Sequence, residues 1–411
     1  MHDVDIVCVD DDAFGYATFQ SHNQKVVENR NGIFITHLKK RLNEAYTAQR
    51  WRLSRSTDGG RTFVTLWEAV DATNAPVLET DAADNLYLIR ADFCGSAGWG
   101  DAYLYRFSPE DDYSKPEQTR LQGGGSAKFS MVPDAVRGQL YYAAHDNTFH
   151  VIGLDGVERR SIQITQPGEI AELEYPHLSL DQDGILHFAW TSEKHGPYHY
   201  QDIRYMRSRD GGDTWETMDG TAVALPVKAD SNGPTDRITL DDEDDEHTWL
   251  ASFMARSGKL HFIYQYSWDL QENRQHYVRY DIATGKRDRD VWPEFKGEHI
   301  SLNHFDGFFA TRAENPDTPL YCIMASEGRI ACLISRDNGD TWQDHALSSR
   351  RFVTAPSPSN PYAIGGCREL TADGAIIGTF TDRNPVAGKK PESLIGVGTS
   401  APAYFFRIES E

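Results

Sequence analysis

Four histidines occupy equivalent places in this sequence, each at or just before the start of a segment typical of a β-strand. They are His22, His177, His247 and His304. An imidazole suits proton transfer near neutral pH because its unperturbed pKa is about 6.5. A single histidine at such a position is usually a core or capping residue. At least two of the four are expected to share a functional site if the fold directs their segments toward one axis.

Basic and aromatic residues are frequent in the segments that would surround the same axis. Aromatic rings stack on sugar rings, and guanidinium groups match the geometry of carboxylates. These residue types therefore favour an acidic carbohydrate as the ligand. The residues expected to bind it are Lys25, Arg41, Arg50, Arg204, His247, Trp268, His304 and Arg383.

Several other chemistries are not indicated. The sequence has no glycine-rich phosphate loop, no G-x-S-x-G element, no H-E-x-x-H motif and no cysteine spacing typical of zinc sites. A group of histidines around a channel could still hold a divalent cation, and the residues do not distinguish Ca²⁺ from Zn²⁺. We expect no required cofactor and leave a cation at the central channel open as an alternative.

The elements that must position these residues are marked by a repeated motif. Residues 56–63, 208–215 and 335–342 all fit S-x-D-x-G-x-T-aromatic, which resembles the Asp-box, or BNR repeat, of sialidase-like propellers. The serine and aspartate can bond the backbone of a tight turn, and the glycine tolerates a positive φ. The motif therefore marks a fold and not a catalytic site.

A longer unit recurs seven times, with an apolar strand, a turn rich in Asp, Gly or Asn, and a second strand rich in aromatic and β-branched residues. The units are 24–37, 76–89, 128–143, 177–190, 247–264, 307–324 and 364–380. The strand 3–9 precedes the first unit, and the last unit has no room for a fourth strand. We therefore predict an all-β chain forming a single seven-bladed β-propeller domain over residues 1–411, closed by the N-terminal strand. The histidine segments would share one face and the Asp-box turns the other.

Composition narrows the range of partners. The chain has 411 residues, with 41 Lys and Arg against 62 Asp and Glu, for a net charge of -21. This charge disfavours nucleic acid and anionic membranes. We expect a cytoplasmic protein because the sequence shows no signal-peptide pattern, or a secreted one if a leader has been removed. The five scattered cysteines are expected to be reduced and buried, and the sequence does not decide between a monomer and a homo-oligomer.

The chain resembles one group of propeller enzymes across nearly its whole length. The residues that carry the resemblance are 21–25 (SHNQK), 51–60 (WRLSRSTDGG) and 175–178 (YPHL). They are similar to the seven-bladed BNR-repeat enzymes that process rhamnose–glucuronate linkages, namely L-rhamnose-α-1,4-D-glucuronate lyases and the related α-L-rhamnosidases, with ulvan lyases as more distant relatives. The resemblance implies an essential first-blade histidine, and His22 matches it. Sialidase activity is not expected, because the Arg-Ile-Pro motif of the six-bladed sialidases is missing.

The resemblance implies one of two reactions at a terminal rhamnosyl–glucuronate linkage. In β-elimination, a base removes the proton α to the carboxylate and an acid protonates the leaving oxygen. We expect His22 and His177 to supply the base, and Tyr175, Tyr200 or a second histidine to supply the acid. The lyase is favoured over the hydrolase, an α-L-rhamnosidase, and a non-catalytic glycan-binding propeller is the alternative from a different class.

Overall fold

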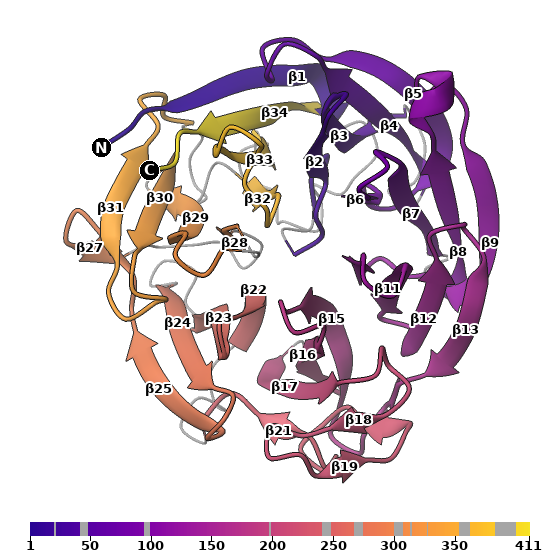
Figure 1. The fold of residues 1–411 in the computed structure, drawn as a ribbon, viewed down its shortest axis with the longest axis vertical. Coiled ribbons are helices and arrows are strands. Elements are labelled where there is room, and N and C mark those ends of the chain that lie inside the picture. The colour runs from indigo at the N-terminus through magenta and orange to yellow at the C-terminus, as the bar shows by residue number, and fades with distance from the viewer. Residues whose placement is uncertain are drawn as a thin grey trace.

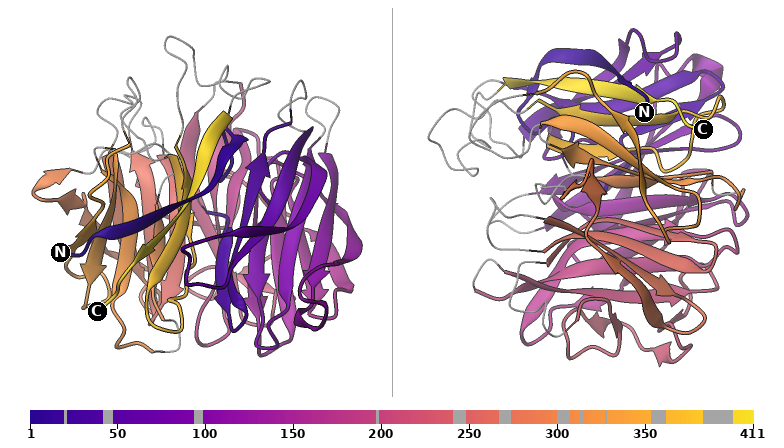
Figure 2. Two further views of the ribbon diagram at one scale, coloured as in Figure 1. Left: turned by 90° about the horizontal axis from the view of Figure 1, so that it is seen from above. Right: turned by 90° about the vertical axis from the view of Figure 1, so that its left-hand side faces the viewer.

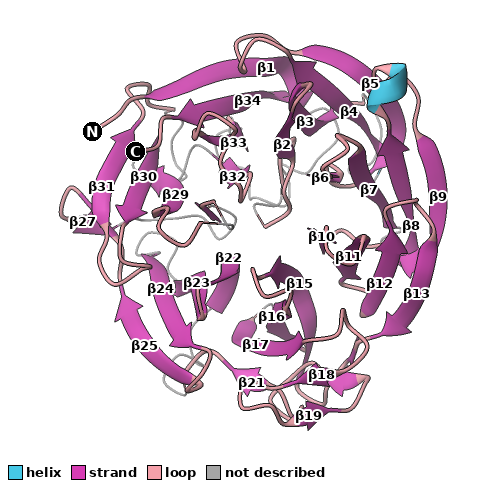
Figure 3. Cartoon of the chain, in the orientation of Figure 1, coloured by secondary structure: helices cyan, strands magenta, loops and turns pink. Residues whose placement is uncertain are grey.

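The chain is built almost entirely of antiparallel β-strands. The computed structural model describes residues 1–19, 22–41, 48–93, 99–196, 199–240, 248–266, 274–299, 307–312, 315–326, 328–352, 362–382 and 400–411. Within these ranges the helical elements are the short 3-10 helix η3 (Pro109–Asp111) and a 3-10 residue at Ala48. Figures 1 and 3 show the strands arranged as sheets around a central axis. The predicted all-β propeller is therefore confirmed.

Seven antiparallel units of at least four strands follow one another along the chain, and strand pairing joins the first and the last of them into one eight-stranded sheet. From the innermost strand outward, the first four are β2 (Val26–Asn29), β3 (Gly32–Lys39), β4 (Gln49–Ser56) and β5 (Val64–Ala72); β6 (Val77–Thr80), β7 (Leu86–Phe93), β8 (Trp99–Phe107) and β9 (Glu117–Gly124); β10 (Phe129–Asp134), β11 (Gln139–Ala144), β12 (Thr148–Gly153) and β13 (Glu158–Gln163); and β15 (Ala171–Leu180), β16 (Leu186–Lys194), β17 (Tyr200–Ser208), β18 (Trp215–Glu216) and β19 (Ala222–Val223). The other three are β22 (Thr248–Arg256), β23 (Lys259–Tyr266), β24 (Arg274–Asp281) and β25 (Lys286–Val291); β28 (Phe308–Ala310), β29 (Leu320–Ser326), β30 (Arg329–Ser335) and β31 (Gln343–Leu347); and β32 (Tyr362–Gly366), β33 (Ile376–Thr381), β34 (Ser400–Ile408) and β1 (Val4–Phe14). Short additional strands are β14 (Thr165–Gln166) with β20 (Val227–Lys228), β21 (Asp236–Arg237) on β17, and β26 (Glu294–Phe295) with β27 (Glu298–His299).

The first strand of the chain belongs to the last sheet. β1 pairs antiparallel with β34 in a register that joins Val4 to Ile408 and Phe14 to Ser400. This pairing agrees with the prediction that the N-terminal strand supplies the outer strand of the last unit. The two ends of the chain accordingly lie side by side in Figures 1 and 2.

Burial follows the position of each strand in its sheet. The inner strands β3, β16 and β22 are buried along most of their length, whereas the outer strand β13 alternates between partly buried and exposed residues. A strand covered on both faces has a nearly continuous apolar sequence, and a strand with one solvated face alternates. The apolar clusters accordingly lie between neighbouring sheets, for example between the second and third and between the fourth and fifth.

The ring has two distinct faces. In an antiparallel meander, the turn after the innermost strand and the turn after the third strand lie at the same end. That end carries the Asp-box turns, and we call it the Asp-box face. The opposite end carries the segments that lead into the innermost strands and those that join the second strand to the third. We call it the histidine face, and Figure 2 shows the strands running between the two.

The three Asp-box turns have the same hydrogen bonds. In the turn after β17, Gly212 N donates to Ser208 Oγ at 2.7 Å, Ser208 Oγ donates to Asp210 Oδ1 at 2.8 Å, and Thr214 Oγ1 donates to Asp210 Oδ2 at 2.6 Å. The equivalent bonds recur in residues 56–62 and 335–341. Gly212 has a φ of +90°, and a Cβ there would overlap the Phe149 ring of the preceding sheet. The motif thus forms the tight turn that its sequence predicted, and it packs closely against the neighbouring sheet.

One expectation about the cysteines is wrong. Cys322, Cys332 and Cys367 are buried free thiols, but Cys8 is exposed, because β1 is an outer strand with one face in solvent. Cys94 lies outside the described residues. In the part of the chain that the structure describes, no helix has the length and apolar character needed to cross a membrane.

Candidate active site

Two of the four predicted histidines meet at the centre of the ring. His22 lies in the segment between β1 and β2, and His177 lies in β15 of the fourth sheet. Their rings are stacked, with centroids 4.4 Å apart and planes inclined by 30°. The first and fourth sheets face each other across the axis (Figure 1), so the segment before β2 reaches the centre to make this contact. His247 and His304 lie outside the described residues.

A distortion in β15 positions the neighbouring tyrosine. The pairing of β15 with β16 shifts register between Glu174 and His177, and Tyr175 has a φ of +47°. A bulky residue in the left-handed region costs on the order of 1–3 kcal/mol, and such strain persists where the surrounding contacts fix it, often at functional sites. The Tyr175 ring meets the His22 ring edge-on, with centroids 5.6 Å apart. The bulge therefore brings Tyr175 and His177 to the same imidazole.

Three aromatic rings support the histidine pair. Tyr200 at the start of β17 and Trp249 near the start of β22 pack against Tyr175 with ring centroids 5.7 and 4.6 Å away, and against each other at 4.3 Å. All three are at most 3% exposed. This apolar layer excludes water from one side of the imidazoles.

A charged group lies on the other side of Tyr175. Lys128 precedes β10, and its ammonium forms an ion pair with the Glu174 carboxylate and lies 4.9 Å from the centroid of the Tyr175 ring. His145, between β11 and β12, places Nε2 at 3.3 Å from Glu174 Oε1. Glu174 is thus shared by an ammonium and an imidazole.

The environment keeps the stacked imidazoles neutral. Burial lowers the pKa of His22 well below its usual value, with further contributions from His177, Lys25 and Lys128, against a hydrogen bond with the Phe129 backbone that raises it. Burial lowers the pKa of His177 to about 3. Nε2 of each ring is buried and has no hydrogen-bond partner among the described residues. Both histidines are therefore in the form that accepts a proton across the usual working range of pH.

One of the two carboxyl groups near the histidine pair, those of Glu174 and Glu193, holds a proton. Burial and the neighbouring Glu174 raise the pKa of Glu193, at the end of β16, to about 8, and Glu193 donates a hydrogen bond to Glu174. Two carboxylates in contact cannot both ionise easily, so one keeps its proton. Burial also lowers the pKa of His145 to about 4, although Glu174 opposes this shift.

Two other residues that were predicted to bind the glycan, Lys25 and Arg41, are less well placed to contact it. Lys25 is close to His22, but it is buried and its Nζ donates to the Asn23 carbonyl at 2.8 Å. Burial lowers its pKa well below the usual value. Arg41 follows β3, where its backbone N–H donates to Gln49 Oε1 at 2.8 Å.

Two predicted arginines lie away from the histidine pair. Arg50, on the third strand of the first sheet, is exposed and pairs with Glu68 at 3.3 Å. Arg204, on the third strand of the fourth sheet, is buried and lies 3.3 Å from Asp202. Four further predicted ligands lie outside the described residues, namely His247, Trp268, His304 and Arg383.

Four charged or titratable residues of the cluster were not predicted as site residues, although the sequence carries a signal for three of them. Lys128 precedes the innermost strand of its unit, as His22 does, and His145 follows a second strand, where the same face is expected. Glu193 also lies at the end of a second strand. Only Glu174, inside an innermost strand, required the bulge to be recognised.

A metal site is not evident in the described ranges. No three His, Cys, Asp or Glu side chains come together there in a way that could hold an ion. The predicted Ca²⁺ or Zn²⁺ at the central channel stays a prediction, since two of its expected histidine ligands lie outside those ranges.

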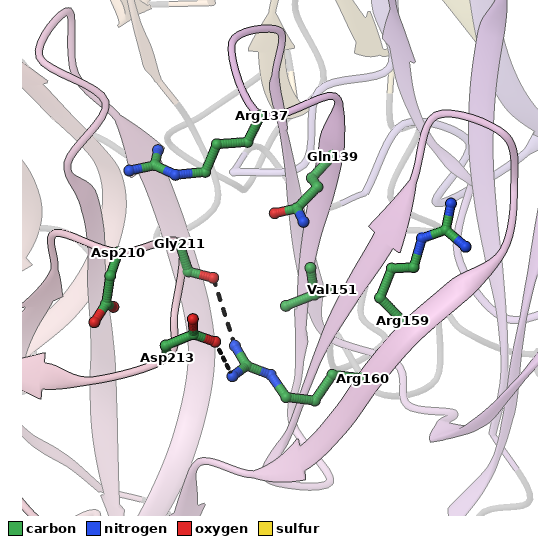
Figure 4. A pocket seen from close by; sticks show the side chains of 8 residues that line it. All are labelled: Arg137, Gln139, Val151, Arg159, Arg160, Asp210, Gly211 and Asp213. Carbon is green, nitrogen blue, oxygen red and sulfur yellow. Dashed lines mark hydrogen bonds and ion pairs between the residues drawn. The ribbon is translucent and has the colours of Figure 1, made fainter.

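Two hollows lined by described residues lie on the Asp-box face. One, of about 510 Å³, is lined by Arg137, Gln139, Val151, Arg159, Arg160, Asp210, Gly211 and Asp213 (Figure 4). Its arginines already have partners, since Arg137 pairs with Asp134, Arg159 with Asp155, and Arg160 with Asp213. A second hollow of about 350 Å³ lies between the first, second and seventh sheets, on the same face, and is lined by residues such as Glu28, Asp81 and Glu369. Neither contains the histidine pair.

Comparison with known proteins assigns the family. Residues 36–292, more than half of the chain, match the family described as BNR repeat-containing family member. The chain belongs to this family, and the expected resemblance to BNR-repeat propellers is confirmed. No curated protein matches the chain at a significant level of sequence similarity.

Solved structures show the same fold. An ulvan lyase of a polysaccharide lyase family, bound to -[GlcA(1-4)Rha3S]-, superposes with a TM-score of 0.64 at 11% identity, covering 92% of this chain and 93% of the lyase. The polysaccharide lyase Uly1 gives a TM-score of 0.62 at 11% identity, with 100% of both chains covered. An α-L-arabinanase of Penicillium chrysogenum, complexed with arabinobiose, gives 0.51 at 13% identity over 98% of both chains. At these identities the similarity shows the fold.

Proposed function

We propose that this protein is a polysaccharide lyase acting on an acidic glycan at the histidine face, and that it cleaves a terminal rhamnosyl-α-1,4-glucuronate linkage. The observation that carries the proposal is the stacked pair of neutral imidazoles, His22 and His177, beside the strained Tyr175. The fold shared with ulvan lyases supports the lyase class, and the ligand of one of them supports an acidic glycan as substrate.

The arrangement suits β-elimination. His22 takes the proton from C5 of the glucuronate, the C–H electron pair forms the C4–C5 double bond, and the C4–O bond breaks. We assign the proton donor for the leaving oxygen to Tyr175, whose buried ring lies edge-on to the His22 ring. In enzymes that use general acid–base catalysis, proton transfer by a positioned side chain raises the rate by about 10²–10⁴-fold.

His22 is a better candidate for the base than the other two imidazoles. His177 is only 4% exposed and lies against His22. His145 is partly exposed, but its Nε2 faces the Glu174 carboxylate. His22 is partly exposed as a residue, and its buried Nε2 atom has no hydrogen-bond partner among the described residues. We therefore assign the base to His22, with His177 supporting its orientation.

The products of one incubation separate the three functions. Wild-type protein is mixed with rhamnose-capped glucuronate oligosaccharides, and both free sugar and the ultraviolet absorbance of an unsaturated uronate are followed. Absorbance that appears with rhamnose supports the lyase. Rhamnose without absorbance indicates an α-L-rhamnosidase, and saturable binding without any product indicates a non-catalytic glycan-binding propeller. The His22→Ala variant is the control for background elimination.

A further inference from the structure

The solvent-facing side of the cluster is formed by few groups. His177, Tyr175, Tyr200 and Trp249 are at most 4% exposed, so they lie behind the surface. His22, Lys128 and His145 are partly exposed. Within the described part of the cluster, these three side chains are the ones open to a ligand.

Lys128 is the better placed of the two lysines near His22. Lys25 and Lys128 both act electrostatically on the His22 ring. The Lys25 Nζ is turned to the Asn23 carbonyl, and burial favours its neutral form. Lys128 is 19% exposed at the side chain and is paired with the carboxylate of Glu174.

The position of the Lys128 ammonium is fixed by two contacts. One is the ion pair with Glu174, and the other is the face of the Tyr175 ring, 4.9 Å from Nζ to centroid. A cation over an aromatic face is held by the ring quadrupole. An ammonium has three N–H donors, so donors remain for a ligand while Glu174 holds the group. Because Tyr175 also contacts His22, the ammonium lies one ring away from the proposed base.

We propose that Lys128 binds the carboxylate of the uronate, and that Glu174 is the positioning residue that holds Lys128 over Tyr175. This inference rests on the proposed function for the identity of the ligand. Lys128 was not among the residues expected from the sequence to bind the glycan, and two of those residues, Arg50 and Arg204, have acidic partners of their own. In β-elimination, negative charge moves onto the carboxylate as the C5 proton leaves, and a fixed cation stabilises that charge.

Binding of a charged and an uncharged ligand tests this role directly. The probes are a glucuronate-containing oligosaccharide and the same oligosaccharide with the carboxyl group reduced to an alcohol, and their dissociation constants are measured by calorimetry. Wild-type protein is expected to prefer the acid by about tenfold or more. Lys128→Met should lose this preference by weakening acid binding alone, Lys128→Arg should retain most of it, and Arg50→Met should behave as wild type.

Each outcome decides the inference. An acid preference that survives in Lys128→Met overturns it, and so does a wild-type protein that binds both probes equally or binds neither. If wild type shows the preference, Lys128→Met loses it, and no glycan is cleaved, then the lyase assignment fails while the carboxylate site stands. If Lys128→Met does not fold, acetylation of wild-type lysines is measured by mass spectrometry with and without the acidic probe. Protection of Lys128 supports the inference, and unchanged labelling overturns it.

Discussion

The two faces of the ring use polar side chains in opposite ways. On the Asp-box face, Asp210 receives hydrogen bonds from Ser208 and Thr214, and Arg160 pairs with Asp213. On the histidine face, the Nε2 atoms of His22 and His177 are buried and have no hydrogen-bond partner among the described residues.

This difference between the two faces suggests that the Asp-box face mainly stabilises the fold and that the histidine face mainly serves function. A buried polar atom without a partner costs on the order of 1–3 kcal/mol, so it is retained only where something else compensates. The histidine face adds the left-handed Tyr175 and two carboxyl groups that share a proton. In the three Asp-box turns the serine, aspartate and threonine side chains are bonded to one another, although Asn338 is left-handed and Trp342 Nε1 has no hydrogen-bond partner among the described residues. We therefore expect substitutions on the two faces to affect different measurements.

The largest expected effect is on rate, at His22. His22→Ala removes the proposed base and should lower kcat/KM by at least about 10²-fold. Arg159→Ala, in the hollow of the Asp-box face (Figure 4), is the matched control and should stay within about twofold of wild type, a difference of less than about 0.5 kcal/mol. Equal rates for His22→Ala and wild type would remove His22 from the site.

The next effect distinguishes the two tyrosines. Tyr175→Phe removes the proposed acid without changing the ring that contacts His22, and we expect a loss of up to about 10²-fold in kcat. Tyr200→Phe should lose less than about tenfold, because Tyr200 contacts Tyr175 and Trp249 behind the histidine pair. The opposite order would assign the acid to Tyr200.

The third effect is on the pH dependence of stability. The pKa of His177 is about 3 in the folded protein and near the ordinary 6.5 when unfolded. As pH falls below 6.5, the unfolded chain takes up a proton that the folded chain does not, so stability decreases. His177→Gln should reduce the loss of unfolding free energy between about pH 7 and about pH 5 by on the order of 2 kcal/mol. An unchanged pH dependence in denaturant titrations would show that His177 is not buried in the neutral form.

The smallest effect belongs to the Asp-box face. Ser208 is fully buried and bonds both Gly212 N and Asp210. Ser208→Ala should lower the free energy of unfolding by about 1–2 kcal/mol and leave kcat/KM unchanged. Ser161→Ala, at an exposed position of an outer strand, is the control for stability. A fall in rate without a fall in stability would contradict the separation of the two faces.

The sequence predicted the ring better than the details of the site. The Asp-box spacing and the recurring strand pairs place the segments of His22 and His177 at one end of the ring, and the same rule covers Lys128 and His145. Arg50 lies at the end of the loop that was expected to bind the glycan, but its side chain pairs with Glu68. Successive side chains of a strand point to opposite faces of the sheet, so an error of one position reverses the predicted direction of a side chain. A residue before proline normally favours extended backbone, so the left-handed Tyr175 could not be inferred from Tyr-Pro-His. It depends on tertiary contacts with His22, Tyr200 and Trp249.

The most direct test of the central claim is a crystal structure of the His22→Ala variant with a rhamnosyl-glucuronate disaccharide. The two faces make different predictions for the position of the ligand. We predict that the glucuronate lies on the histidine face, with its carboxylate at Lys128 and its C5 directed to the place vacated by the imidazole. A disaccharide bound only among the arginines of the Asp-box face would contradict the account.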